Sequence, residues 1–256
     1  MDGFDPAASF GPDAASRYDA SPRGDEAETV DLLALLAGDG PALELAIGTG
    51  RVALPLAGRG LRVDGIELSP AMIDRLRAKP GGADLAVTLG DMTSAGTGTS
   101  YPLVFLVFNT IFNLLTQDEQ VECFRNAARH LTDTGAFVVE AAVPSAWTGE
   151  HAYARPEHVG LDRVVLDVCR YDPVTQLLEE NHVELSAQGC RFAPIVCRLA
   201  WPAELDLMAR LAGLRLADRW GGWRHEPFTA SSERHVSVYR RETDVADGQS
   251  QTTSSS

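Results

Sequence analysis

Acidic side chains and glycines are placed in this chain where they could hold a polar ligand. Residues 41–51 read P-A-L-E-L-A-I-G-T-G-R, so that Glu44 stands inside an apolar run. A carboxylate in such a run is costly unless it is hydrogen-bonded or meets a cation. Gly48 and Gly50 follow, and glycine lets the backbone turn sharply and approach a ligand without an intervening Cβ atom. Glu67 closes the next apolar segment, 17 positions after Gly50, where a carboxylate can accept hydrogen bonds from a ribose.

These side chains need a parallel sheet to bring them together. The run at 42–47 has the length of a buried strand, and the glycine turn leads directly into a helix that starts near Arg51. Strand, glycine turn and helix form the floor of a nucleotide site in doubly wound α/β domains. Further strands are expected at 61–69, 84–89, 103–108, 135–143, 214–220 and 234–240, and helices at 25–37, 70–78 and 116–131. The expected fold class is therefore α/β, a doubly wound, mostly parallel seven-stranded sheet with helices on both faces.

The motifs E-L-A-I-G-T-G-R, G-I-E-L-S-P and L-G-D-M resemble those of the class I S-adenosylmethionine (SAM) methyltransferases. The resemblance covers residues 32–143 well and the remainder loosely. It implies SAM as the cofactor, with S-adenosylhomocysteine as the product. Ala46 stands where the family has its first glycine, an exchange that is tolerable if φ is negative there.

The resemblance also implies roles for individual residues. The glycine turn and Glu44 would surround the methionine part of SAM, Glu67 would hold both ribose hydroxyls, and Asp91 with the Met92 backbone would address the adenine. The full set of expected cofactor-binding residues is Tyr18, Glu44, Ala46, Gly48, Gly50, Arg51, Glu67, Leu68, Met72, Asp91, Met92, Phe108 and Asn109.

The rest of the chain is expected to add three parts to a SAM-binding core at 25–144, which residues 201–241 complete. Residues 1–24, the N-terminal arm, are either flexible or a lid that folds over the cofactor through Tyr18, as in related small-molecule methyltransferases. Residues 145–200 contain β-rich segments at 161–171, 176–185 and 191–199, which predict an inserted antiparallel β meander. Residues 242–256 have nothing to bury and are expected to be disordered.

The inserted meander resembles the roof over the cofactor mouth in sugar N,N-dimethyltransferases and glycine N-methyltransferases. Such a roof indicates an enclosed small acceptor, and it could also form the interface of a homodimer. Four aromatic residues are candidates for contacting the acceptor: Trp147, Tyr153, Trp220 and Trp223. For the stretch W-G-G-W at 220–223, a bend between edge strands that is covered by tryptophans is an equally good interpretation.

Candidate catalytic residues are Asn113, Glu140 and His225. Asn113 aligns with a histidine that lies next to the acceptor amine in the sugar N,N-dimethyltransferases, but an amide cannot accept a proton at neutral pH. Glu140, inside a predicted strand, points either at the site or at a buried partner. His151, His158 and His182 are further candidate bases, each with a surface role as the more ordinary interpretation.

Composition excludes several function classes. With 256 residues and a net charge of −14, the chain would repel a polyanion, so no nucleic-acid partner is expected. The N-terminus lacks the charge and apolar core of a signal peptide, and no apolar run is long enough to span a membrane, so we expect a cytoplasmic protein without a membrane partner. The four cysteines lack paired ligand spacing, and no metal is expected.

These observations predict a SAM-dependent methyltransferase that acts on an N or O atom of a small acceptor, in bacterial secondary metabolism. Two alternatives remain at this stage. A nicotinamide-dependent oxidoreductase would share the glycine turn and Glu67, but residues 46–51 lack the first and last glycines of G-x-G-x-x-G. A non-catalytic SAM-binding scaffold or sensor would keep the same cofactor residues.

Overall fold

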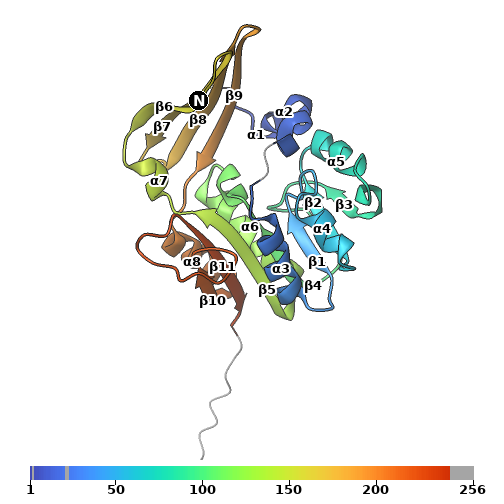
Figure 1. Ribbon diagram of the computed structural model, residues 1–256. Helices are drawn as coiled ribbons and strands as arrows, with labels where there is room; N and C mark the ends of the chain where they lie inside the picture. The colour runs from blue at the N-terminus through green and yellow to red at the C-terminus, as the bar shows by residue number, and fades with distance from the viewer. Residues whose placement is uncertain (2, 21–22, 243–256) are drawn as a thin grey trace, which may run out of the picture.

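A seven-stranded sheet forms the centre of the computed structural model, which describes residues 1, 3–20 and 23–242 (Figure 1). The strands lie in the order β10-β11-β5-β4-β1-β2-β3. Strand β11 runs antiparallel to both of its neighbours, and the other contacts are parallel. The expected fold class is confirmed. The strands are β1 Ala42–Leu45, β2 Val63–Glu67, β3 Ala86–Leu89, β4 Tyr101–Leu106, β5 Leu131–Ala142, β10 Leu214–Trp220 and β11 Arg234–Arg241.

Helices cover both faces of this sheet. Helices α3 (Glu26–Ala37), α4 (Ala53–Gly58) and α5 (Pro70–Arg77) contribute to one buried apolar cluster. Helices α6 (Gln117–His130) and α8 (Pro202–Leu211) contribute to the cluster on the other side. The expected helix starts are confirmed, because the Ser69 hydroxyl accepts from the Met72 N–H and Thr116 forms a capping box with Glu119. Within the described residues, none of the helices is both long and apolar enough to cross a membrane.

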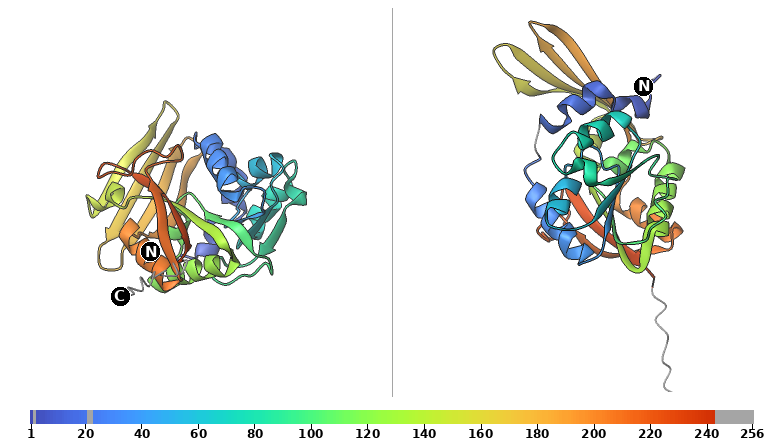
Figure 2. Two further views of the ribbon diagram at one scale, coloured as in Figure 1. Left: turned by 90° about the horizontal axis from the view of Figure 1, so that it is seen from below. Right: turned by 90° about the vertical axis from the view of Figure 1, so that its right-hand side faces the viewer.

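A separate antiparallel sheet, here called the roof, stands over one end of the core (Figure 2). It consists of β6 (Ala152–Val159), β7 (Arg163–Asp172), β8 (Leu177–Ser186) and β9 (Gly189–Arg198), and the short α7 (Ser145–Thr148) leads into it. The sequence predicts three of these strands and misses β6. That strand pairs with β7 alone, is largely exposed and contains Pro156, which suits an edge strand but hides its pattern.

The N-terminal arm is folded in the structure. It forms α1 (Pro6–Ser9), α2 (Pro12–Arg17) and a 3₁₀ turn, η1 (Tyr18–Ala20). Helix α1 packs against β9 of the roof and α2 packs against α5 of the core. Figure 1 shows both helices between β9 of the roof and α5 of the core. The tail that is expected to be disordered comprises residues 242–256, and all of it except Glu242 lies outside the described residues.

Candidate active site

The turn after β1 is built around left-handed backbone conformations. Ala46, Gly48 and Gly50 have φ values of +54°, +56° and +78°. The condition under which alanine would be a tolerable exchange, a negative φ at Ala46, is therefore not met, and the alanine carries the strain that the family's glycine would avoid. At Gly50 an added Cβ atom would lie 2.2 Å from Leu76 Cδ1, so the close approach of α5 excludes any side chain.

Glu67 joins this turn to the start of α5. Its Oε2 atom accepts from the Gly48 N–H at 2.8 Å, and its Oε1 atom accepts from the Ser69 N–H at 2.8 Å. Burial raises the pKa of Glu67, and these backbone donors oppose the rise. Because a carboxylate oxygen has a second lone pair, Glu67 can still accept from ligand hydroxyls.

Glu44 is a buried carboxylate whose Oε2 atom has no hydrogen-bond partner among the described residues. Burial raises the pKa of Glu44 well above its ordinary value. The side chain lines a small pocket together with Tyr18, Thr49 and Arg51. An orphaned carboxylate oxygen beside a glycine turn suits a cationic amino group, such as the one in the methionine part of SAM.

Two consecutive residues after β4 are also left-handed, Phe108 with φ +62° and Asn109 with φ +60°. Such a conformation is a genuine outlier for a bulky residue, and strain of this kind clusters at functional sites. Hydrogen bonds hold it in place: the Phe108 N–H donates to Glu140 Oε2 at 2.7 Å, and Asn109 Oδ1 accepts from the Ala142 N–H at 2.6 Å. The following 3₁₀ turn, η3 (Thr110–Asn113), carries Asn113.

Glu140 anchors the N-terminal arm. Its two oxygens accept from the Arg23 guanidinium at 3.0 and 2.5 Å, and the guanidinium lies 4.1 Å from the centre of the Phe108 ring. The sequence left two orientations open for Glu140, toward the site or toward a buried partner. The structure shows the second, with Arg23 as the partner. This corrects its candidate role as a base, because both oxygens are engaged and the side chain does not line the main cavity.

The arm also contacts the glycine turn itself. Asp19 accepts from the Thr49 hydroxyl at 2.7 Å and forms an ion pair with Lys79 Nζ at 2.8 Å. The Arg51 guanidinium donates to the Tyr18 carbonyl at 3.0 Å and lies 4.9 Å from the centre of the Tyr18 ring. Burial raises the pKa of the Tyr18 phenol, which therefore stays neutral. The arm thus closes over the turn after β1.

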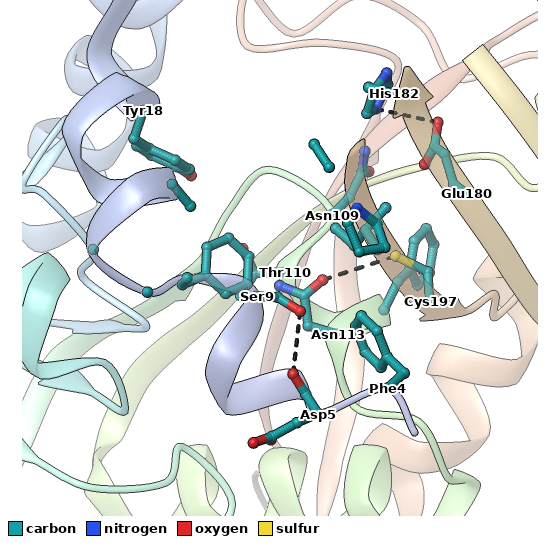
Figure 3. A pocket seen from close by; sticks show the side chains of 18 of the residues that line it. Phe4, Asp5, Ser9, Tyr18, Asn109, Thr110, Asn113, Glu180, His182 and Cys197 are labelled. Carbon is teal, nitrogen blue, oxygen red and sulfur yellow. Dashed lines mark hydrogen bonds and ion pairs between the residues drawn. The ribbon is translucent and has the colours of Figure 1, made fainter. Parts of the chain in front are cut away.

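A cavity of about 1080 Å³ lies between the arm, the core and the roof (Figure 3). The structure brings nine of the sequence-predicted site residues to its wall: Tyr18, Ala46, Gly48, Glu67, Met72, Phe108, Asn109, Asn113 and Trp147. Glu44 and Arg51 line the adjoining small pocket. Asn113 Oδ1 lies 3.8 Å from the Cys197 thiol of the roof, so the end of β4 and the roof meet in this wall.

Other predicted residues do not line the main cavity. Trp223 is buried in the apolar cluster that contains α3, and Trp220 packs edge-on against His225 at 4.4 Å, which supports the alternative of a covered bend. Tyr153 lies under the Arg155 guanidinium on β6.

Four of the expected cofactor-binding residues also lie outside the cavity wall. Asp91 Oδ1 accepts from the Thr93 N–H and hydroxyl, as a turn residue does. Gly50, Leu68 and Met92 are likewise absent from the cavity wall.

Sequence reasoning missed several residues that the structure brings to the site. Phe4, Phe10, Glu180 and Cys197 line the cavity, and Arg23 secures the arm. His182, one of the further candidate bases, lines the cavity too. The alternation of side chains along β8 could have identified Glu180 from the sequence, because it places Glu180 on the same face as His182. For Arg23 no local signal exists, since its partner is 117 positions away.

Comparison with known proteins agrees with this geometry. A family model described as a methyltransferase domain matches residues 42–135. The structure of the CcbJ methyltransferase from Streptomyces caelestis is 39% identical with a TM-score of 0.88, and the match covers 94% of this chain and 100% of that one. The cypemycin N-terminal methyltransferase of a Streptomyces species is 29% identical over 78% of this chain and 82% of its own length.

A more distant solved structure, the sugar N-methyltransferase KedS8 from Streptoalloteichus, shares the fold. Its TM-score is 0.65 at 23% identity, with 90% of this chain and 92% of that chain covered. The glycine turn, Glu67 and the orphaned Glu44 fit SAM, and the match to CcbJ extends over nearly the whole chain. The chain therefore belongs to the class I SAM-dependent methyltransferases, with SAM as its methyl donor.

Proposed function

We propose that this enzyme transfers the methyl group of SAM to a nitrogen atom of a small natural-product amine. The observation that carries this proposal is the cavity, which runs from the glycine turn to the roof and is covered by the arm. Its volume of about 1080 Å³ is that of a small-molecule site rather than of a protein-docking surface.

The walls of the cavity support an acceptor with an apolar body and a polar group. Aromatic side chains from the arm, the core and the inserted segment line the cavity: Phe4, Phe10, Phe108, Phe112, Trp147 and Phe192. Asn109 and Asn113 add amide groups at the carboxyl end of β4. Convergent polar groups in an apolar enclosure orient a ligand and give it specificity.

The chemistry requires little beyond alignment and the exclusion of water. SAM supplies an electrophilic methyl carbon on a sulfonium sulfur. The arm and the roof enclose the acceptor, and the strained turn after β4 fixes Asn109 and Asn113 beside it. Nitrogen is favoured over oxygen because a neutral amine attacks without further activation, whereas a hydroxyl needs a strong base. The names of the cypemycin and KedS8 enzymes describe N-methylation, which supports the same choice.

Calorimetric titration tests the cofactor part of the proposal. We expect S-adenosylhomocysteine to bind with micromolar affinity and NADH, the control, not to bind. Binding of NADH alone would contradict the proposal and restore the oxidoreductase alternative.

Transfer of labelled methyl groups tests the acceptor part. The panel pairs each amine with a partner in which that amine is replaced by a hydroxyl or blocked. The pairs are aminosugars and sugars, short peptides and their amino-terminally acetylated forms, and aryl-alkyl amines and alcohols. We expect label in amines only. Label in the hydroxyl partners alone would refute N-methylation, and cofactor binding without any transfer would favour the sensor alternative.

A further inference from the structure

The roof presents a row of polar side chains to the cavity. Strands β7 and β8 pair so that Glu180 faces Cys169 and His182 faces Asp167. Because side chains alternate along a strand, Glu180 and His182 lie on the same face of β8, and both line the cavity. Figure 3 shows them across the cavity from Tyr18.

This part of the wall has an excess of negative charge. His182 Nε2 lies 3.6 Å from Glu180 Oε1, and His182 Nδ1 lies 3.1 Å from Glu157. The Cys169 thiol donates to Asp167 at 3.0 Å, and polar atoms of these two residues and Glu180 lie within 4.8 Å of one another. Two carboxyl groups, Glu180 and Glu157, therefore share one imidazole, and Asp167 lies close to Glu180 as a third. Among the ion pairs of the described residues, Glu180 has no arginine or lysine partner.

Glu180 is suited to exchange a proton near neutral pH. Burial raises its pKa to about 7; Asp167 and Glu157 add to the rise, and His182 opposes it. The other titratable groups around it, Tyr153 on β6, Cys169 on β7 and Cys197 on β9, have their pKa values raised by burial and stay neutral. A carboxyl group in this range is both a ligand for a cation and an effective base.

We propose that Glu180 receives the acceptor as an ammonium ion and takes one proton from it before methyl transfer. This inference rests on the proposed N-methylation. The N–H bond breaks and its electron pair stays on nitrogen, while the proton passes to a Glu180 oxygen. The nitrogen lone pair then forms the N–C bond with the sulfonium methyl carbon, and the electrons of the broken C–S bond go to sulfur, which leaves a neutral thioether.

The other buried carboxylates of the site are already engaged or lie elsewhere. Both oxygens of Glu67 accept from backbone N–H groups, and both oxygens of Glu140 accept from Arg23. Glu44 lines the small pocket beside the glycine turn rather than the main cavity. Glu180 is the carboxylate that the roof itself supplies to the acceptor.

Sinefungin allows a test without a known acceptor, because this SAM analogue carries an amino group in the place of the transferred methyl group. The measurement is the ratio of its affinity to that of S-adenosylhomocysteine, by calorimetry at pH 8 and pH 6. In wild type we expect the ratio to favour sinefungin at pH 8 and to fall at pH 6, as Glu180 becomes protonated. In Glu180→Gln the ratio at pH 8 should be about tenfold lower, the scale of a lost charge-assisted hydrogen bond, and independent of pH.

Glu184→Gln is the matched control, since Glu184 lies on the same strand and face but pairs with Arg163 and Arg191 outside the cavity. It should keep the wild-type ratio. Equal ratios in wild type and Glu180→Gln would overturn the proposal. Absence of S-adenosylhomocysteine binding to wild type would instead contradict the proposed function, so the two failures are distinguishable.

Kinetics with the amine that wild type methylates fastest in the panel give a second readout. We expect kcat/KM of wild type to rise with pH through about 7, as Glu180 ionises. Glu180→Gln should lower kcat/KM about a hundredfold, the scale of general base catalysis, and remove this rise. An unchanged pH profile in Glu180→Gln would refute the role of Glu180 as proton acceptor.

Discussion

At the scale of single residues, Glu67 performs two tasks with one carboxylate. It accepts from the Gly48 and Ser69 N–H groups, so it fixes the glycine turn, and it faces the cavity with its remaining lone pairs. We expect Glu67→Ala to weaken binding of S-adenosylhomocysteine by about 1–3 kcal/mol in calorimetry, because charge-assisted hydrogen bonds are lost.

Asp64→Ala is the matched control, because Asp64 lies on the same strand and bonds Arg62 and the Tyr101 hydroxyl away from the site. It should lower stability and leave the affinity unchanged. Unchanged affinity in Glu67→Ala would exclude Glu67 from ribose binding.

A substitution at Ala46 is expected to stabilise the protein. With φ at +54°, alanine carries a conformational cost of about 1 kcal/mol that glycine does not. We expect Ala46→Gly to raise the free energy of unfolding by roughly 0.5–1 kcal/mol in urea denaturation, since the gain exceeds the added entropy of the unfolded chain. Ala53→Gly, at the buried first position of α4, should lower stability instead, because a buried methyl group is lost. A loss of stability in both variants would show that Ala46 is not strained.

At the scale of elements, the N-terminal arm joins the roof to the core. It holds the glycine turn through Asp19 and Tyr18 and buries little apolar surface of its own. We expect deletion of residues 1–20, which leaves Arg23 in place, to reduce turnover at least ~10-fold because water is no longer excluded. The free energy of unfolding should fall by less than ~2 kcal/mol, since such segments are among the least stable parts of a fold.

Turnover and urea denaturation should be measured on the same preparations. Arg125→Ala, which removes an exposed ion pair with Glu122 on α6 away from the cavity, is the control and should change neither quantity appreciably. Equal losses of turnover and stability on deletion would mean that the arm is part of the core rather than a cover.

The sequence predicts most elements of the core and about half of the site, for a physical reason. Buried parallel strands are continuous apolar runs, so β1 and β4 can be located without knowledge of their neighbours. Strand β6 could not be located, because an exposed edge strand containing Pro156 has no such pattern. Likewise, the partner of Glu140 and the burial of Trp223 depend on contacts between distant segments, which local periodicity does not contain.

At the scale of the whole molecule, stability depends on pH through buried groups outside the site. His235 on β11 is fully buried, its Nε2 atom has no partner among the described residues, and burial lowers its pKa to about 3. The folded state therefore keeps His235 neutral while the unfolded chain takes up a proton below about pH 6.5. Stability is lost as the pH falls through that window.

We expect this contribution to amount to about 1.4 kcal/mol per pH unit between pH 6 and 4. The raised pKa values of Glu44 and Glu180 act in the opposite direction, so the test is the difference between wild type and His235→Gln. Urea denaturation across this range should show a steeper loss of stability in wild type. Parallel curves for the two proteins would contradict a neutral buried His235.

Along the chain, the roof is one insertion between β5 and α8, so the polypeptide enters it once and leaves it once. Residues 145–200 contribute Trp147, Glu180 and Cys197 to the cavity, whereas the glycine turn and Glu67 belong to the core. The insertion's share of the cavity wall is thus encoded apart from the glycine turn and Glu67, while Asn109 and Asn113 at the acceptor end belong to the core. We expect a chimera that carries a relative's insertion to keep SAM binding and to shift its choice of acceptor toward that of the relative.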